Sequence, residues 1–225
     1  ADYASTATGA LADGTEVPVM HGCGHDTHVT AALIAAGLLA RQLDAWAGTI
    51  VWIFQPGEEI AAGAAAMVAD GLWDRAPRPE VVLGQHVSPL VPSGSVALHP
   101  ETAMAMADSL RVTVSGRQSH GAQPQLSIDP IVLGAHMIVR LQTVVSREMS
   151  PLSSAVVTCG TFHAGLKENI IPGEAEFTLN IRTLTEDTRE QVLAAVTRIV
   201  EAEAAASGAP SPRVEEIYRF PRLHN

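Results

Sequence analysis

The chain has 225 residues, of which 47% are hydrophobic, so it can bury one large core or two small ones. Lysine and arginine number 14 against 24 aspartates and glutamates, and the net charge of −10 argues against nucleic acid as a partner. The longest apolar runs are shorter than the roughly 20 residues that cross a membrane, and the acidic start does not resemble a secretory signal. Two cysteines, Cys23 and Cys159, are too few for a disulfide framework and predict reduced thiols in a soluble, cytoplasmic protein.

The first half of the chain has the pattern of an α/β domain. Apolar residues recur at helical spacing from about Thr27 to Leu43, with Asp26 or Thr27 as the expected N-cap. Residues 48–55 and 80–86 are short apolar runs of the kind that form buried strands of a parallel sheet, and an alanine-rich helix is expected between them. Helix, strand, helix, strand predicts part of a parallel α/β sheet.

The second half predicts a different arrangement, in the order strand, helix, strand, strand, helix, strand. This is the split β-α-β-β-α-β motif of ferredoxin-like folds. The strands are expected at 109–116, 155–163, 173–183 and 213–220, and the helices at 128–147 and 186–208. We therefore expect a first domain over 1–107, a smaller domain over 108–219, and a return of the chain into the first domain at 220–225.

Coordinating side chains occur at three points of the first domain. Cys23 and His25 are two residues apart just before a predicted helix, where an extended segment points both the same way and the helix dipole favours a thiolate. Glu58 and Glu59 directly follow one predicted strand, and His86 ends the next. Because the carboxyl ends of parallel strands meet at one edge of a sheet, we expect these side chains to form a metal site.

The two adjacent glutamates call for separate roles. Neighbouring side chains do not point in one direction, so one can bind a metal while the other acts as a general base. Each group also has a simpler interpretation: Glu58 and Glu59 as first-turn residues favoured by the helix dipole, and Cys23 as a small buried residue. Cys23 as the nucleophile of a hydrolase, with His25 or His28 as its base, leaves the glutamate pair unexplained.

Short stretches spread over nearly the whole chain carry a resemblance to a known family. They are "MHGCGHDTH", "IFQPGEE", "GQHV", "SGRQSHGAQP" followed by "SIDPIV", "LQTVVSRE", "ENIIPGEAEF" and "IRTL". In that order they resemble the amidohydrolase branch of the dinuclear metallopeptidases. This branch includes hippurate hydrolases, N-acyl-amino-acid amidohydrolases and hydrolases of auxin-amino acid conjugates, and it is related to aminoacylase and glutamate carboxypeptidase.

The resemblance implies four metal ligands, a general base, a group that stabilises the oxyanion, and two substrate contacts. The metal ligands would be Cys23, His25, Glu59 and His86, and the general base would be Glu58. His120 would stabilise the oxyanion, and Asn169 and Arg182 would contact the substrate. Arg182 is the candidate partner of a substrate carboxylate, and His120 would act in the active site of its own subunit or of a partner subunit. Asp26 and His28 are expected behind the ligands, where they would orient them.

The residues of the smaller domain have simpler interpretations when the resemblance is set aside. His120 lies in a turn-like stretch and would be a surface histidine. Asn169 would shape the turn before Pro172, and Arg182 would be a solvated strand end.

The resemblance implies a part of a parallel-sheet metallopeptidase catalytic domain joined to a lid and dimerisation domain. The expected reaction is hydrolysis of the amide of an N-acyl or N-aroyl amino acid by a metal-activated water, in a cytoplasmic homodimer. The cofactors would be two divalent ions of zinc, manganese, cobalt or nickel, since the ligands are of mixed type. Alternatives are a dipeptidase or carboxypeptidase of the same superfamily, a non-catalytic dimerising fragment, and a cysteine-nucleophile hydrolase.

Two motifs of the family are not in the sequence. One is a strand segment similar to "RADMDALP" before the first motif, and the other is a last histidine ligand far downstream. His224 is not that ligand, because "FPRLHN" resembles the earlier return of the chain into the catalytic domain. We therefore expect the chain to be an internal portion of the enzyme, with part of the catalytic domain and a complete lid.

Overall fold

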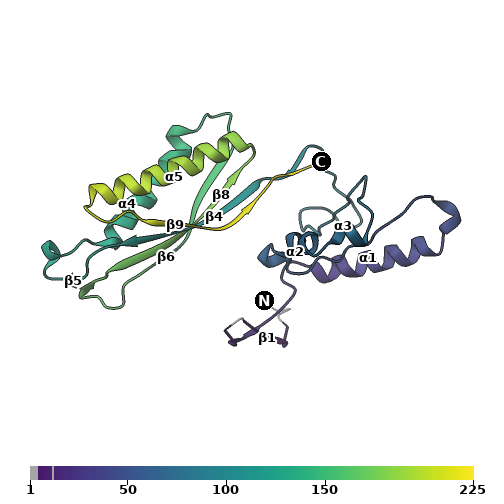
Figure 1. Ribbon diagram of the computed structural model, residues 1–225, viewed down its shortest axis with the longest axis horizontal. Coiled ribbons are helices and arrows are strands. Elements are labelled where there is room, and N and C mark those ends of the chain that lie inside the picture. The colour runs from purple at the N-terminus through teal and green to yellow at the C-terminus, as the bar shows by residue number, and fades with distance from the viewer. Residues whose placement is uncertain (1–4, 12) are drawn as a thin grey trace. The chain divides into compact units, whose positions relative to one another are not determined.

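The structure is a computed structural model that describes residues 5–11 and 13–225 (Figure 1). It divides into two compact units, Ala1–Ala97 and Leu98–Asn225. The division falls before the boundary expected near Ala107, and residues 220–225 belong to the second unit. No helix in the described part of the chain is long and apolar enough to cross a membrane.

The second unit contains the predicted β-α-β-β-α-β order. Its four long strands form one antiparallel sheet in the spatial order β6-β8-β4-β9. The strands are β4 (Met106–Ser115), β6 (Ala155–Ala164), β8 (Glu174–Thr183) and β9 (Arg213–Phe220), and the helices are α4 (Pro130–Thr143) and α5 (Glu186–Ala206). A π-helical turn over Val144–Glu148 extends α4. The helix predicted to end near residue 147 is therefore an α-helix followed by a π-helical turn.

Both long helices begin at residues suited to that position. The Asp129 carboxylate accepts hydrogen bonds from the backbone N–H groups of Ile131 and Val132 at 2.9 and 3.2 Å, ahead of a proline at the first turn of α4. The Thr185 hydroxyl accepts from the backbone N–H of Thr188 at 3.3 Å, and acidic residues occupy the first turn of α5. Local sequence therefore fixes where each helix starts.

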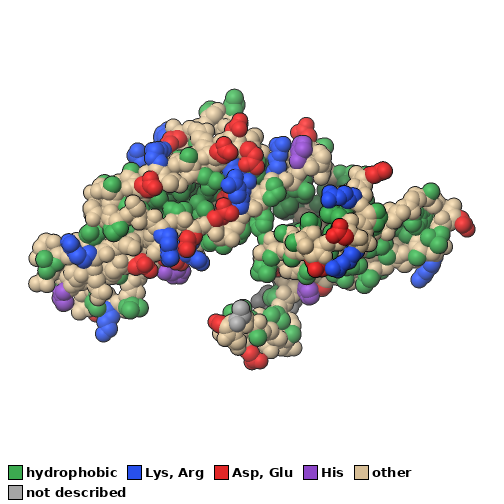
Figure 2. Space-filling model, in the orientation of Figure 1, with side chains coloured by type: hydrophobic (Ala, Val, Ile, Leu, Met, Phe, Trp, Pro, Cys, Tyr) green, Lys and Arg blue, Asp and Glu red, His purple; other side chains and the backbone are tan. Residues whose placement is uncertain are grey.

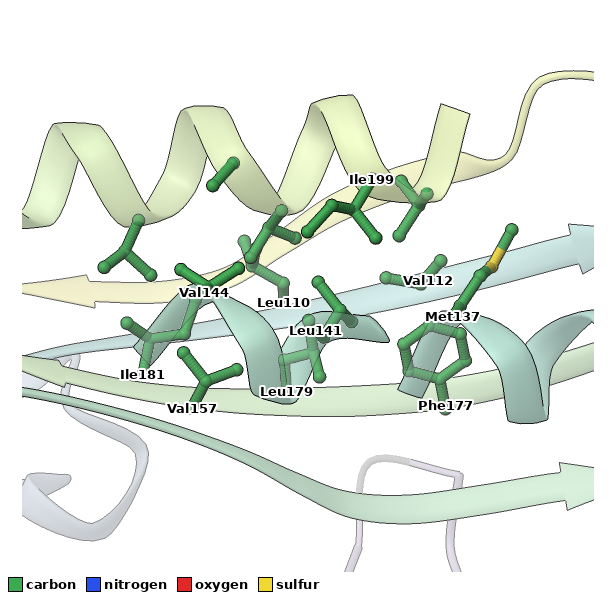
Figure 3. Close-up of a cluster of buried hydrophobic side chains, with 14 of the residues drawn as sticks. Leu110, Val112, Met137, Leu141, Val144, Val157, Phe177, Leu179, Ile181 and Ile199 are labelled. Carbon is green, nitrogen blue, oxygen red and sulfur yellow. The ribbon is translucent and has the colours of Figure 1, made fainter. Parts of the chain in front are cut away.

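The two helices cover one face of the sheet and enclose the core of this unit (Figure 3). On β8 every second side chain points toward the helices, and Phe177, Leu179 and Ile181 are at most 1% exposed. They pack with Val112 of β4 and Met137 of α4. The alternate residues of β8 lie on the opposite face and are polar or charged: Glu176, Thr178, Asn180 and Arg182.

The other strands of the described residues form short pairs. In the second unit, β5 pairs with β7 and β3 pairs with β10, while β1 pairs with β2 in the first unit. Their bounds are β1 (Thr8–Ala10), β2 (Glu16–Pro18), β3 (Thr102–Met104), β5 (Ser119–His120), β7 (Ile170–Ile171) and β10 (Leu223–His224). Single 3-10 turns lie at Leu43–Ala45 and Pro124–Leu126.

The main helix of the first unit, α1 (His25–Ala40), begins earlier than the sequence predicts. Its N-cap is Gly24, with φ of 81°, and neither Asp26 nor Thr27 caps it. The Thr27 hydroxyl donates to the Gly24 carbonyl at 2.6 Å instead. Because glycine adopts this left-handed conformation without a steric cost, the chain turns sharply there and places His25 at the first position of the helix.

The two strands predicted in the first unit are wrong. Residues 48–55 and 80–86 contain no strand, and their large apolar side chains are exposed, Leu83 by 91%. A strand exists through the hydrogen bonds of a neighbouring strand, and neither segment has such a neighbour in the described part of the chain. The described residues of the first unit thus contain no parallel sheet, and Figure 2 shows hydrophobic side chains at the surface around α1.

The single helix predicted after Gln55 is also wrong. The structure has a 3-10 turn (Glu58–Ile60), α2 (Gly63–Ala69) and α3 (Leu72–Arg75) in its place. Left-handed residues separate these pieces, with φ of 53° at Ala61 and 83° at Gly71. The alanine-rich composition favours helix, but these residues break its hydrogen-bond pattern.

An ion pair is buried between the sheet and α5. Asp108 of β4 and Arg189 of α5 are 1% and 3% exposed. The Arg189 Nε donates to both carboxylate oxygens at 3.1 and 3.0 Å, and Nη2 donates to Oδ1 at 2.6 Å. Burial alone would lower the pKa of Arg189, but hydrogen bonds and charge from Asp108 raise it above its ordinary value.

Removal of one partner of this ion pair should lower the free energy of unfolding, because the other partner stays buried. We expect Asp108→Ala to lower the free energy of unfolding by about 3 kcal/mol, because it leaves the Arg189 guanidinium buried beside only Glu186. The matched control is Glu148→Ala, which removes the partner of the largely exposed Arg198 and should cost less than about 1 kcal/mol. Urea denaturation followed by far-ultraviolet circular dichroism measures both, and equal losses would contradict a special role for the buried pair.

Candidate metal centre

Five side chains of the first unit come together although they lie far apart in the sequence. The ligand atoms of Cys23, His25 and His86 lie within 4.8 Å of one another, and so do those of His25, Glu58 and Glu59. His25 belongs to both groups. The structure therefore brings together the four predicted metal ligands and the predicted general base.

A glycine allows the first motif to approach the third. Gly24 lies between Cys23 and His25 in the left-handed conformation, and a Cβ added there would be 2.8 Å from Cγ2 of Val87. A side chain at this position would collide with Val87 and would also strain the backbone. The second glycine of "HGCGH" is thus required for Cys23 and His25 to meet His86.

The backbone N–H and C=O groups of Val87 each contact a histidine. His86 Nδ1 lies 2.7 Å from the Val87 carbonyl oxygen, so this nitrogen carries the proton and donates it. The Val87 N–H donates to His28 Nε2 at 3.0 Å, so that nitrogen is the unprotonated one. The other nitrogen of His86, Nε2, therefore presents its lone pair 3.4 Å from the Cys23 sulfur, which is the form in which histidine binds a metal.

The surroundings of His28 favour its neutral form. Burial lowers the pKa of His28, and the neighbouring His86 and His25 lower it further. Its ring lies 4.6 Å from that of His86 between centroids. His28 is therefore placed to orient His86 through Val87, whereas the Asp26 side chain makes no hydrogen bond among the described residues.

The two glutamates reach opposite sides of one imidazole ring. Glu58 Oε2 lies 3.4 Å from His25 Nε2, and Glu59 Oε1 lies 3.5 Å from His25 Nδ1. Their side chains are 59% and 70% exposed. The neighbouring carboxylates thus contact different nitrogens of the same ring, although a ligand oxygen of each lies within 4.8 Å of the other.

A tightly wound loop carries the glutamate pair. Gly57 and Ala61, at the two ends of the 3-10 turn, are left-handed, with φ of 59° and 53°. The Ala61 N–H donates to the Glu58 carbonyl at 2.7 Å. A Cβ on Gly63 would lie 1.5 Å from the Pro56 carbonyl oxygen, so only glycine fits there. Sequence reasoning missed Gly63 and Val87. A second glycine six residues after Gly57 was a signal for Gly63, but the sequence carries none for Val87.

The second unit holds the other predicted site residues. His120 of β5 lies opposite Ile170 of β7, and the Gly121 N–H donates to the Asn169 carbonyl at 2.8 Å. His120 and Asn169 are therefore neighbours at one end of this ribbon. The Ala122 N–H donates to His120 Nδ1 at 3.1 Å, which leaves Nε2 as the protonated nitrogen and an available donor.

Arg182 lies near the end of β8, on the face of the sheet that the helices do not cover. Its Nε donates to the Asn180 side-chain oxygen at 3.0 Å. The structure gives no contact that unites Arg182 with His120 and Asn169, so their common role stays a prediction.

Comparison with known proteins identifies the family. A profile of the peptidase family M20/M25/M40 matches residues 3–216. The chain belongs to this family. It is 38% identical over 188 residues to the N-acetyl-L-cysteine deacetylase of Bacillus subtilis, covering 84% of this chain and 44% of the relative. It is 39% identical over 189 residues to the hippurate hydrolase of Campylobacter jejuni, covering 84% and 49%.

A solved structure of the M20 family agrees with this assignment. The crystal structure of a dinuclear metal-binding peptidase of the M20 family from Bacillus subtilis has a TM-score of 0.70 at 30% identity, covering 96% of this chain and 54% of that one. The resemblance seen in the sequence motifs is therefore confirmed. The chain spans about half the length of the curated relatives it matches.

The fit of the glutamate loop can be tested through Gly63. Gly63→Ala should move Glu58 and Glu59 away from His25 and weaken zinc binding by about 10-fold or more, the scale for residues that orient ligands. Gly37→Ala is the matched control, since no atom lies within 4 Å of its added Cβ in α1. Competition of zinc between the protein and a chromogenic chelator measures the affinity. Unchanged affinity in Gly63→Ala would show that the loop does not position a metal ligand.

Proposed function

We propose that the enzyme hydrolyses the amide bond of N-acyl or N-aroyl amino acids. The observation that carries this proposal is the convergence of Cys23, His25 and His86 with two carboxylates that contact different nitrogens of His25. The names of the two curated relatives support the substrate class, because N-acetyl-L-cysteine and hippurate, which is benzoylglycine, are both amides of an amino acid nitrogen.

Two divalent ions fit the donors that the first unit presents. Cys23, His25, Glu59 and His86 would hold them, and thiolate with imidazole and carboxylate suits zinc, manganese, cobalt or nickel better than magnesium or calcium alone. The preset tautomer of His86 favours this interpretation, since its free nitrogen already faces the Cys23 sulfur. When bound, such ions supply Lewis acidity, which polarises an amide carbonyl and acidifies a water.

The chain's own residues then move the proton and bind the substrate. Glu58 takes the proton of the attacking water and passes it to the leaving nitrogen. His120 donates a hydrogen bond from Nε2–H to the oxyanion, and Asn169 and the Arg182 guanidinium contact the substrate, Arg182 at the carboxylate of the amino acid. No covalent intermediate is needed, so Cys23 serves as a ligand in this scheme.

The two glutamates test the proposal, because their predicted roles differ. In the full-length metal-loaded enzyme, Glu58→Gln should retain its metal and lose about 100-fold or more in turnover of hippurate. Glu59→Gln should instead lose bound metal. Elemental analysis and chromatography of the released amino acid measure the two effects. Reversed phenotypes would exchange the roles, and a wild-type enzyme that releases no amino acid from any N-acyl amino acid would refute the function.

The second unit supports the further proposal that the enzyme is a homodimer. Strand β6 is an edge of the sheet, so its outer backbone groups have no strand partner among the described residues. Beside it α4 exposes apolar side chains, with Val132 and Val139 at 54% and 72% exposure. An unpaired edge next to an apolar helix surface suits a two-fold contact with a second copy.

Mixed dimers test whether His120 acts across such an interface. Full-length His120→Ala and Glu58→Gln subunits are each expected to be inactive, but a mixed dimer unites an intact His120 with an intact Glu58 in one of its sites. Activity should then recover in up to about half the sites of each mixed dimer. Native mass spectrometry confirms subunit exchange. Exchange without recovered activity would place His120 in its own subunit's site or outside catalysis.

A further inference from the structure

A chain of hydrogen bonds crosses the helix-free face of the sheet and ends at Arg182. The Arg182 Nε on β8 donates to the side-chain oxygen of Asn180 at 3.0 Å. The Asn180 Nδ2 in turn donates to the Tyr218 hydroxyl on β9 at 2.9 Å. The chain of contacts therefore runs from one strand to another across β4, which lies between them.

A small residue on β4, Ser109, leaves room for Asn180 and Tyr218 to meet across this strand. Ser109 lies opposite both Asn180 and Tyr218 in the register of the sheet, so those two side chains meet above a serine. The Tyr218 ring also stacks on Phe220, with centroids 4.9 Å apart and an angle of 23° between the planes. Stacking fixes the ring, and the fixed ring sets the position of the hydroxyl.

Arg182 and Tyr218 together fix the Asn180 side chain, since the guanidinium only donates and so faces the amide oxygen, which leaves the amide nitrogen for the Tyr218 hydroxyl. With its nitrogen directed to the hydroxyl, the amide presents its oxygen to Arg182. The opposite orientation would place an NH₂ group, which can only donate, against the guanidinium, which also can only donate. The Tyr218 hydroxyl accepts the Nδ2 hydrogen bond and thereby anchors Asn180 in the orientation that holds Arg182.

The partner of Arg182 is neutral, and this distinguishes it from Arg189. Arg189 is buried and neutralised by the Asp108 carboxylate. Arg182 is exposed, is held through Nε by an amide, and has no carboxylate partner in the described part of the chain. Its orientation is thus restricted while its full charge and both Nη groups remain free for a ligand carboxylate.

We infer that Asn180 and Tyr218 are positioning residues, which direct the Arg182 guanidinium toward the carboxylate of the substrate. This inference rests on the proposed function and deepens it. Neither residue needs to touch the substrate. Loss of either should weaken recognition of the carboxylate and leave the chemistry at the amide unchanged.

Kinetics on a matched pair of substrates tests the inference in the full-length metal-loaded enzyme. The pair is an N-acetyl amino acid and the corresponding N-acetyl amino acid amide, which lacks the carboxylate. Tyr218→Phe should raise KM for the acid about 5-fold, the scale of one hydrogen bond, with kcat within about twofold. Asn180→Asp should raise it by about 10-fold or more, because a carboxylate at this position neutralises Arg182. Neither change should alter KM for the amide.

Thr178→Ala is the matched control. Thr178 lies on the same strand and face, but its hydroxyl contacts Thr161 at 2.8 Å, on β6 and away from Arg182. This variant should leave KM for both substrates unchanged. Equal losses on the acid and the amide, or no change in Tyr218→Phe and Asn180→Asp, would overturn the inference.

A spectroscopic readout separates this inference from the proposed function. The Nε–H resonance of Arg182, assigned by its loss in Arg182→Lys, should exchange slowly with water and become faster in Asn180→Ala and Tyr218→Phe. N-acetylglycine should shift this resonance, whereas N-acetylglycinamide should not. An enzyme without turnover but with this selective shift would refute the function alone. A resonance that responds equally to both compounds, or that is unchanged in the two variants, would refute the positioning role.

Discussion

The candidate metal centre depends on the backbone N–H and C=O groups of Val87. No sheet exists among the described residues to align the three motifs of the first unit, and α1 contributes no buried side chain. The hydrogen bond from the Val87 N–H to His28 instead joins the start of α1 to the segment after residue 80. The bond from His86 Nδ1 to the Val87 carbonyl also selects the tautomer of His86, so this contact leaves Nε2 with the free lone pair that a metal ligand needs.

The sequence predicts the second unit far better than the first, for a physical reason. The β-α-β-β-α-β elements contain their own hydrogen-bond partners, their own caps at Asp129 and Thr185, and an alternation on β8 that matches one covered and one open face. In the first unit, the apolar runs at 48–55 and 80–86 indicate a tendency to be buried. Composition carries no information on whether a neighbouring strand is available, and these predictions failed there.

For the candidate metal centre, the side chains could be predicted from the sequence but the groups that support them could not. That Cys23, His25 and the two glutamates would lie together was predictable from residue type, spacing and resemblance. The supports were not, because Val87 acts through its backbone and Gly63 acts through the absence of a side chain. Asn180 was missed for a related reason: its alignment with Tyr218 depends on strand register across β4, which residue spacing on one strand does not specify.

The distance between Cys23 and His86 would also suit a nucleophile and its base, but the surroundings favour a ligand pair. A general base must take a proton and release it during turnover, which requires a ring whose other nitrogen can stabilise the charged form, typically against a carboxylate. The Nδ1 of His86 meets a neutral carbonyl rather than a carboxylate, and the rings beside it are the imidazoles of His25 and His28. A metal ion can use the lone pair that His86 Nε2 presents toward Cys23, and a metal site gives His25 and both glutamates a function that a cysteine mechanism does not give them.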